Sequence, residues 1–190
     1  MENNILKRTI AKPTKLGTIQ TTKKHNPLIS EKAIEILNYR IEQEEFSSRL
    51  YLSMSMWLTN SGYRNAGELW LKYSKEEQSH ADWSRDYLLS MGVQPNTPLL
   101  QAPGNSYTGL CEIIKLSYEH EIQVTEQCKQ LAAESLKEGD TMLFTLSQKY
   151  LAEQIEEHSK MQDHIDALEA FGEDKIALRL LDNSFEDLLN

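Results

Sequence analysis

The sequence predicts an all-α protein: a four-helix bundle with a long crossover between its second and third helices and a short fifth helix at the C-terminal end. Four helix-length stretches each carry a seam of residues whose spacing alternates between three and four, which places each seam on one buried helix face. Only eight glycines and five prolines occur in 190 residues, and 39% of the residues are hydrophobic. This composition is typical of a helical protein with one substantial core.

The first two helices are expected to form an antiparallel hairpin. The first begins after Ser30, a favourable N-cap residue, and ends near Thr59. A tight turn at 60–62 then reverses the chain, so that the second helix, over about 64–91, runs antiparallel to the first. Gly92 suits the left-handed conformation that closes a helix.

The connection that follows contains Pro95, Pro98 and Pro103 and is long enough to cross the whole bundle. About 15 extended residues reach roughly 50 Å, whereas a helix of 25–30 residues is about 40 Å long. The second and third helices are therefore expected to run parallel.

The third and fourth helices form the second expected hairpin, over about 107–137 and 141–171. Asp140 can cap the fourth helix, and Gly172 is placed to end it. A short amphipathic segment follows and predicts a fifth helix, with one apolar face made of Leu178, Leu181, Phe185 and Leu188.

Charge divides the chain into a basic N-terminal segment, residues 1–27, and an acidic domain, residues 28–190. The first segment lacks sustained apolar periodicity and is expected to be a flexible tail. The tail has six basic residues and one acidic residue, a net charge of +5. Because the whole chain carries −9, the remaining 163 residues carry −14. So acidic a domain argues against nucleic-acid binding by the core and suits a cationic cargo.

Neither a membrane span nor a disulfide framework is expected. No apolar run approaches the roughly 20 residues that cross a bilayer, and the first residues lack the apolar block of a secretory signal. Cys111 and Cys128 do not form a C-x-x-C motif and are interpreted as ordinary helix residues. The expected location is the cytoplasm.

Near the middle of every seam, apolar residues give way to possible metal ligands. These are Glu44 in the first helix, Glu77 and His80 in the second, Glu121 in the third, and Gln154 and Glu157 in the fourth. Four buried carboxylates without a compensating charge would cost several kcal/mol each, so a metal-free polar network is disfavoured. Carboxylates with one imidazole favour iron or manganese over softer metals. The sequence therefore predicts a dinuclear metal centre inside the bundle.

Four segments around these positions resemble the ligand segments of bacterial non-haem ferritins. They are Glu44-Glu45-Phe46-Ser47-Ser48-Arg49-Leu50-Tyr51, Glu76-Glu77-Gln78-Ser79-His80, Tyr118-Glu119-His120-Glu121 and Glu153-Gln154-Ile155-Glu156-Glu157. The resemblance extends over residues 28–190, including the crossover and the fifth helix, and implies a ferritin-like bundle.

The resemblance implies a ferroxidase centre with two iron sites. Glu77 would bridge the two irons. Glu44 and His80 would complete one site, and Glu121 with Gln154 the other.

Further residues are implied around this centre. Tyr51 matches the tyrosine that lies beside the centre in the family, so that Tyr51 and Glu77 are the expected catalytic residues. A third, looser iron site would be formed by Glu76, Glu153, Glu156 and Glu157. Two to three irons per chain are therefore expected, without haem.

The implied function is iron storage with ferroxidase activity. Fe(II) would be oxidised to Fe(III) by O₂ or H₂O₂ and stored as ferric oxyhydroxide inside a hollow homo-oligomeric shell of 24 subunits. No membrane partner is implied.

Other ferritin-like classes fit the residues less well. Bacterioferritins and rubrerythrins repeat E-x-x-H on the fourth helix, where this chain has Gln154-x-x-Glu157, and Met54 and Met56 lie on the first helix instead of the second, where a haem-binding methionine belongs. Only the basic tail favours a DNA-protecting or peroxide-detoxifying mini-shell. A di-iron oxygenase remains an open alternative.

The other histidines are not expected to be ligands. His120 and His158 lie one position from seam residues and therefore point away from the seam, toward the surface or an interface. His164 lies on the seam and is interpreted as a hydrogen-bonded core residue.

Overall fold

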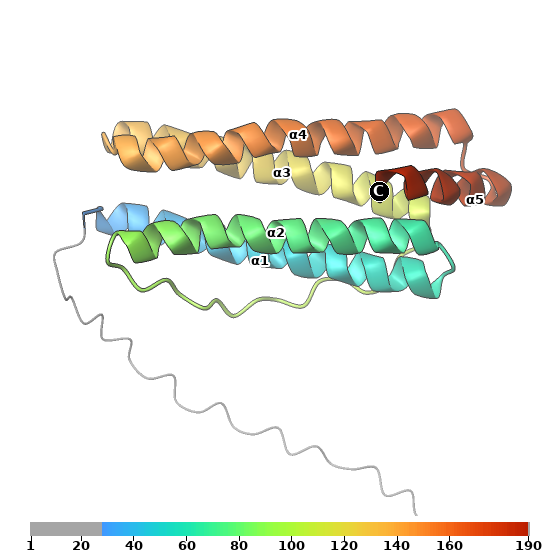
Figure 1. Cartoon of the computed structure of the whole chain (residues 1–190), viewed down its shortest axis with the longest axis horizontal. Helices are drawn as coiled ribbons and strands as arrows, with labels where there is room; N and C mark the ends of the chain where they lie inside the picture. The colour runs from blue at the N-terminus through green and yellow to red at the C-terminus, as the bar shows by residue number, and fades with distance from the viewer. Residues whose placement is uncertain (1–27, 190) are drawn as a thin grey trace, which may run out of the picture.

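The structure, a computed structural model, describes residues 28–189, and the predicted basic tail over residues 1–27 lies outside this range. Within the described range all regular secondary structure is helical, and no strand occurs (Figure 1). Its elements are α1 (Glu31–Asn60), α2 (Arg64–Ser90), α3 (Leu110–Lys137), α4 (Thr141–Phe171), α5 (Lys175–Ser184) and a 3₁₀ helix, η1 (Phe185–Leu188). The predicted four-helix bundle with a short C-terminal helix is confirmed. None of the described helices combines the length and apolarity that a membrane span requires.

The helix boundaries follow from local capping chemistry. The Ser30 side chain accepts a hydrogen bond from the Ala33 N–H at 3.1 Å, and Asp140 caps α4 in the same way through Leu143 at 2.9 Å. Gly92 has a φ of 78°, a conformation that other residues adopt only with strain, and it terminates α2 as predicted.

The third helix begins at Leu110, three residues later than the sequence predicted. The backbone N–H and the hydroxyl of Thr108 both donate to the Glu112 carboxylate, so Thr108 is held in the turn before the helix. This difference follows from side-chain capping, which competes with helical backbone bonding.

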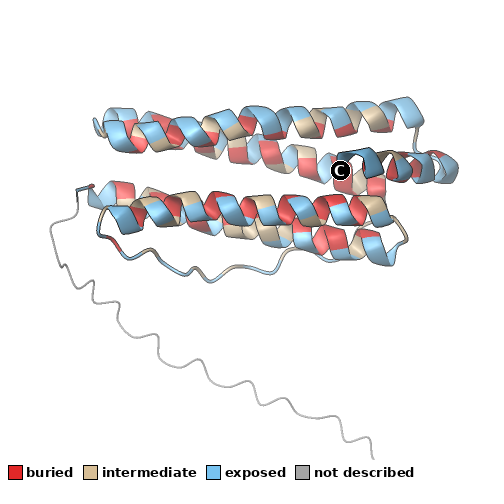
Figure 2. Cartoon of the chain, viewed as in Figure 1, coloured by how far each residue is buried: buried red, intermediate tan, exposed pale blue. Residues whose placement is uncertain are grey.

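The two hairpins pack face to face, and residues 91–109 run back along the α1–α2 hairpin (Figure 1). This crossover makes α2 and α3 parallel, as predicted. Buried residues form stripes on the faces that the hairpins turn toward each other (Figure 2).

The core has two hydrophobic clusters, one toward each end of the bundle. One cluster includes Met54, Trp70 and Ile113, and the other includes Ile41 and Leu143. The predicted ligand positions fall between these clusters along each helix. The polar site is therefore enclosed by apolar packing above and below.

The C-terminal segment joins the two hairpins. Asp182 of α5 accepts a hydrogen bond from the Ala66 N–H in the first turn of α2 at 2.9 Å, and Arg179 donates to the Gly62 carbonyl. The predicted fifth helix is broken at Phe185, where the 3₁₀ turn places the phenyl ring against Trp70.

Asp182→Ala is expected to lower the free energy of unfolding by about 1–2 kcal/mol, because it removes a buried cap from α2. Urea unfolding of the metal-free protein measures this loss. Asp187→Ala removes an exposed aspartate from the neighbouring turn and serves as the control. Equal losses in the two variants would contradict a capping role for Asp182.

Candidate metal centre

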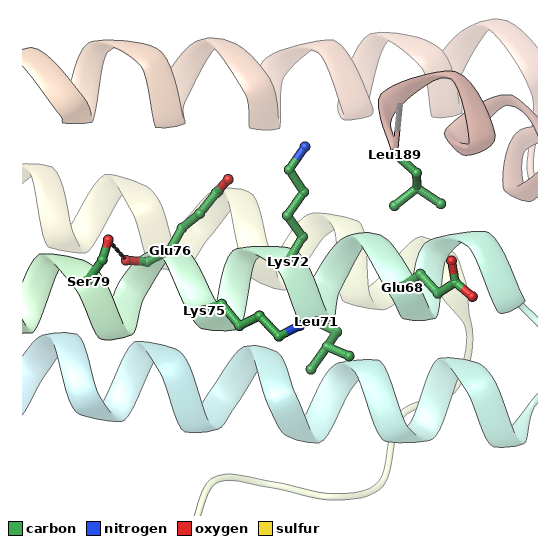
Figure 3. Close-up of a pocket in the computed structure, with 7 residues that line it drawn as sticks. All are labelled: Glu68, Leu71, Lys72, Lys75, Glu76, Ser79 and Leu189. Atoms are coloured by element: carbon green, nitrogen blue, oxygen red, sulfur yellow. Dashed lines mark hydrogen bonds between the residues drawn. The ribbon is translucent and has the colours of Figure 1, made fainter.

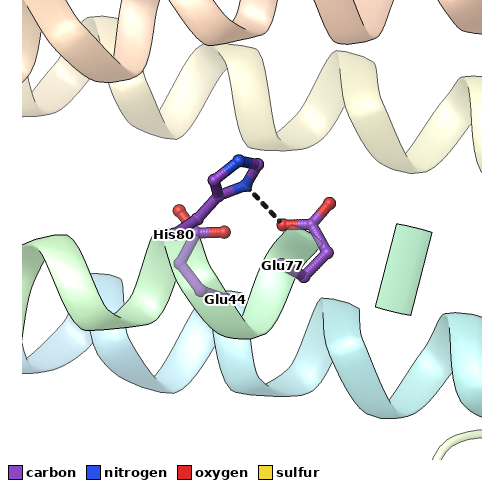
Figure 4. Close-up of side chains that lie close together, drawn as sticks. All are labelled: Glu44, Glu77 and His80. Atoms are coloured by element: carbon purple, nitrogen blue, oxygen red, sulfur yellow. Dashed lines mark hydrogen bonds and ion pairs between the residues drawn. The ribbon is translucent and has the colours of Figure 1, made fainter. Parts of the chain in front are cut away.

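Three side chains from the α1–α2 hairpin converge in the middle of the bundle. Glu44 of α1 and Glu77 and His80 of α2 are buried, and each offers a ligand atom within 4.8 Å of the others. Figure 4 shows all three pointing away from their own hairpin, toward α3 and α4. His80 Nδ1 lies 3.1 Å from Glu77 Oε2. This trio contains the ligands that sequence analysis assigned to the first iron and to the bridge.

The facing hairpin contributes Glu121 from α3 and Gln154 and Glu157 from α4, all buried. The Tyr51 hydroxyl donates to Glu121 Oε1, and the Gln154 amide lies 3.3 Å from Glu121 Oε2. Glu121 is therefore held from α1 and from α4 at once. Gln154 Oε1 accepts a hydrogen bond from Thr125 at 2.9 Å, which fixes the orientation of the amide.

The residues of the expected third iron site are brought together only in part. Glu153 Oε1 lies 3.6 Å from His80 Nε2, and these two residues form a second possible ligand group with Glu157. Glu76 is half-buried on α2. Glu156 is exposed and belongs to neither ligand group of the described residues. Its position follows from helix geometry, because it lies about 100° around α4 from Glu157.

A buried cation that the sequence did not predict lies beside the centre. Arg40 lies one turn before Glu44 on α1, and its side chain is 2% exposed. Arg40 Nε donates to Glu44 Oε1 at 2.6 Å, and Nη1 donates to Gln127 of α3 at 2.7 Å. Burial alone lowers the pKa of Arg40, but the Glu44 carboxylate more than offsets this, so the pKa is raised. The i,i+4 spacing from Glu44 was the available signal.

Arg40 occupies one oxygen of Glu44 and leaves the other free. Glu44 Oε2 is buried and has no hydrogen-bond partner. An unpaired buried carboxylate oxygen is costly, and a bound cation would relieve that cost. The geometry suits Glu44 as a ligand through this single oxygen.

Without a metal ion, the electrostatics of the centre favour protonated Glu77, Glu121 and Glu157 and a neutral His80 imidazole. Burial raises the pKa of Glu77 well above its usual range, and Glu121 and Glu44 add to the effect. Burial also raises the pKa of Glu121 to about 8 and raises that of Glu157. Burial lowers the pKa of His80, which keeps the imidazole in the form that binds metal. A divalent cation would reverse this balance by stabilising the ionised carboxylates.

The metal-free protein is expected to lose stability as the pH rises from about 6.5 to 8. Glu121 stays protonated in the folded state up to about pH 8, whereas it ionises near its ordinary pKa when unfolded, so the folded state binds more protons. Burial lowers the pKa of His120 and of His164 to about 4, which opposes this trend only below about pH 6.5. Above about pH 6.5 the raised pKa values of the buried carboxyls set the direction of the trend.

Thermal unfolding followed by circular dichroism measures this effect. The midpoint should be lower by about 4 °C at pH 8 than at pH 6.5. Saturating Zn²⁺ should remove the difference, because it favours the ionised carboxylates. Equal midpoints in the absence of metal would show that the carboxyls ionise without cost.

The remaining histidines take different positions. His164 is buried, and its Nε2 lies 2.7 Å from the Tyr73 hydroxyl, which confirms the prediction of a hydrogen-bonded core residue. His158 is exposed, as predicted. His120 points away from the seam but is half-buried between α1 and α3, where its Nε2 lies 2.8 Å from the Ser47 hydroxyl. Its expected place at the surface or an interface is corrected, because α1 covers it.

Comparison with known proteins identifies the family. The sequence pattern of the ferritin family, described as a ferritin-like domain, matches residues 34–171. A probable bacterial non-heme ferritin-like protein of Haemophilus influenzae is 31% identical, over 85% of this chain and 98% of that protein. The bacterial non-heme ferritin of Escherichia coli O6:H1 is 29% identical over the same shares of the two chains.

The solved structures agree with the sequence matches. An open-pore ferritin from the hyperthermophilic archaeon Archaeoglobus fulgidus superposes with a TM-score of 0.80 and 31% identity, over 83% of this chain and 96% of that one. With the family pattern covering more than half of its residues, the chain belongs to the family of ferritin-like domains.

Proposed function

We propose that this chain is the subunit of an iron-storage ferritin and that it oxidises Fe(II) to Fe(III) at a dinuclear centre within each subunit. The observation that carries the proposal is the buried trio Glu44, Glu77 and His80, whose ligand atoms lie within 4.8 Å of one another. Glu121 on the facing hairpin supplies the carboxylate for a second ion. Relatives named bacterial non-heme ferritins support the same function.

Each residue has a distinct proposed role. Glu77 bridges two iron ions, and Glu44 and His80 complete the first site. Glu121 and Gln154 complete the second. Carboxylate oxygens with one imidazole suit Fe(II), and they suit Fe(III) better still because the harder ion gains more from anionic oxygen ligands.

Tyr51 positions Glu121 through its hydroxyl. Burial raises the pKa of Tyr51, with further contributions from Glu121 and Glu77, so the phenol keeps its proton. It thereby acts as a hydrogen-bond donor that fixes one carboxylate beside the reacting ions, and this contact supports a positioning role for Tyr51 in the proposed reaction.

The reaction transfers one electron from each of two Fe(II) ions to a single molecule of O₂ or H₂O₂. Ferric ions then hydrolyse and add to a ferric oxyhydroxide mineral. We propose that residues 28–190 form the subunit of a cytoplasmic, 24-subunit hollow shell and that the acidic domain draws Fe(II) inward.

Stopped-flow absorbance tests the proposal directly. Metal-free protein is mixed aerobically with up to four Fe(II) per chain. A fast phase that saturates near two Fe(II) per chain is expected, and sedimentation velocity should give the mass of a 24-subunit shell. Oxidation at the rate of buffer alone would overturn the ferroxidase assignment, and a smaller assembly would overturn the shell.

A further inference from the structure

Lys160 of α4 places an ammonium group among the carboxylates of the expected third iron site. Its Nζ lies 2.8 Å from Glu157 Oε1 and 3.5 Å from Glu76 Oε2. The Lys160 side chain is 35% exposed, whereas that of Glu157 is 3% exposed. The lysine therefore reaches inward from the edge of the bundle to a buried carboxylate.

Glu76 lies on α2 and faces the same ammonium group. Figure 3 shows its side chain reaching from α2 toward α4. Glu76 Oε2 is buried and has no hydrogen-bond partner, so the ion pair with Lys160 is the compensation that the structure provides for it. One lysine thus links two carboxylates of two different hairpins.

An ammonium group and a divalent ion cannot both occupy this position. A metal ion bound between Glu76 and Glu157 would use the oxygens that Lys160 already contacts, and the two positive charges would repel each other at close range. An iron ion could enter only after Lys160 had moved away, and the loss of its ion pairs would weaken iron binding.

The structure offers Lys160 a place to move to. A pocket of about 180 Å³ adjoins it and is lined in part by Glu76, Asp163 and His164. Asp163 lies three residues after Lys160 on α4, a spacing at which helix side chains meet. Lys160 can therefore turn from Glu157 toward Asp163 without leaving the pocket.

We propose that Lys160 is a built-in counter-ion that takes the place of a third iron, so that each chain binds two divalent ions tightly instead of three. The inference rests on the proposed dinuclear function, since it concerns the outer edge of the same centre. Lys160 is then a residue that determines the number of ions held.

Calorimetric titration with Zn²⁺, which undergoes no redox reaction, tests this proposal on the full chain. Wild-type protein should bind two Zn²⁺ per chain tightly. Lys160→Met keeps much of the side-chain length but removes the charge, and it should add a third ion that binds about tenfold tighter than any third ion in the wild type. Lys160→Arg should behave as the wild type does.

The matched control is Lys129→Met. Lys129 pairs with Glu126 at 2.6 Å with the same three-residue spacing, but both residues are exposed on α3. This variant should bind two Zn²⁺. The proposal would be overturned if Lys160→Met and the wild type bound the same number of Zn²⁺ ions per chain with the same affinities. It would also be overturned if the wild type bound three Zn²⁺ ions tightly.

A measurement on the wild type keeps the test independent of how well the variant folds. In crystals soaked with Zn²⁺, anomalous scattering should show two peaks per chain, with Lys160 still beside Glu157. A third peak between Glu76 and Glu157 would overturn the role of Lys160 and leave the dinuclear function standing. If no peaks appeared at the proposed dinuclear centre, both this proposal and the proposed function would be contradicted.

Discussion

Glu77→Ala is expected to slow the fast phase of Fe(II) oxidation by about 100-fold or more, because it removes the one carboxylate proposed to bridge both ions. His80→Ala should slow it as well, since it removes the imidazole from the first site. Stopped-flow absorbance at two Fe(II) per chain measures both effects. The shell should still assemble, because both side chains are buried inside the subunit.

Glu77→Ala should leave the metal-free bundle as stable as the wild type or more stable. Burial raises the pKa of Glu77 in the folded state, so the side chain opposes folding at neutral pH. Glu68→Ala, which removes an exposed glutamate from the same helix, is the control for both measurements. Normal oxidation by Glu77→Ala would exclude the proposed centre.

Arg40→Met is expected to have the largest effect on the metal-free protein. It should lower the free energy of unfolding by about 3–5 kcal/mol, because it leaves Glu44 buried without its partner. Saturating Zn²⁺ should recover much of this loss, since the ion then compensates Glu44. Chemical denaturation with and without Zn²⁺ measures both values.

Arg85→Met provides a matched comparison within the same hairpin. Arg85 pairs with Glu45 and Asp82, but its side chain is 21% exposed. Solvent screens such a pair, so the expected loss is below about 1 kcal/mol. A similar loss of unfolding free energy in the two variants would mean that burial does not determine how much the Arg40 ion pair stabilises the fold.

The sequence predicted the bundle because the seam spacing held along all four helices and a capping residue agreed with it at the starts of α1 and α4. The seam around Glu44 and Tyr51 kept its three-and-four spacing for many turns, and Ser30 and Asp140 supplied caps at the expected starts. The ligand positions followed from the same register. A polar residue on a buried face needs a partner, and six such residues at matching depth indicate a shared one.

The sequence did not predict that two long basic side chains outside the seam contact carboxylates of the site. Arg40 turns inward because Gln127 of α3 accepts one of its hydrogen bonds, and that pairing depends on how the hairpins pack. Lys160 likewise reaches Glu76 across the gap between two helices. The break at Phe185 was also unpredicted, since it depends on the room beside Trp70. Each depends on contacts between residues far apart in the sequence.

The division of the proposed ligands between two hairpins affects how the subunit responds when metal ions bind and leave. The proposed ligands Glu44 and Glu77 belong to one half of the chain, and the proposed ligands Glu121 and Gln154 to the other. A bound ion therefore acts as a cross-link between the halves, and its departure removes that link. Arg40 and Lys160 pair with Glu44 and Glu157, one in each half, so these two carboxylates keep a positive partner after the ions have left.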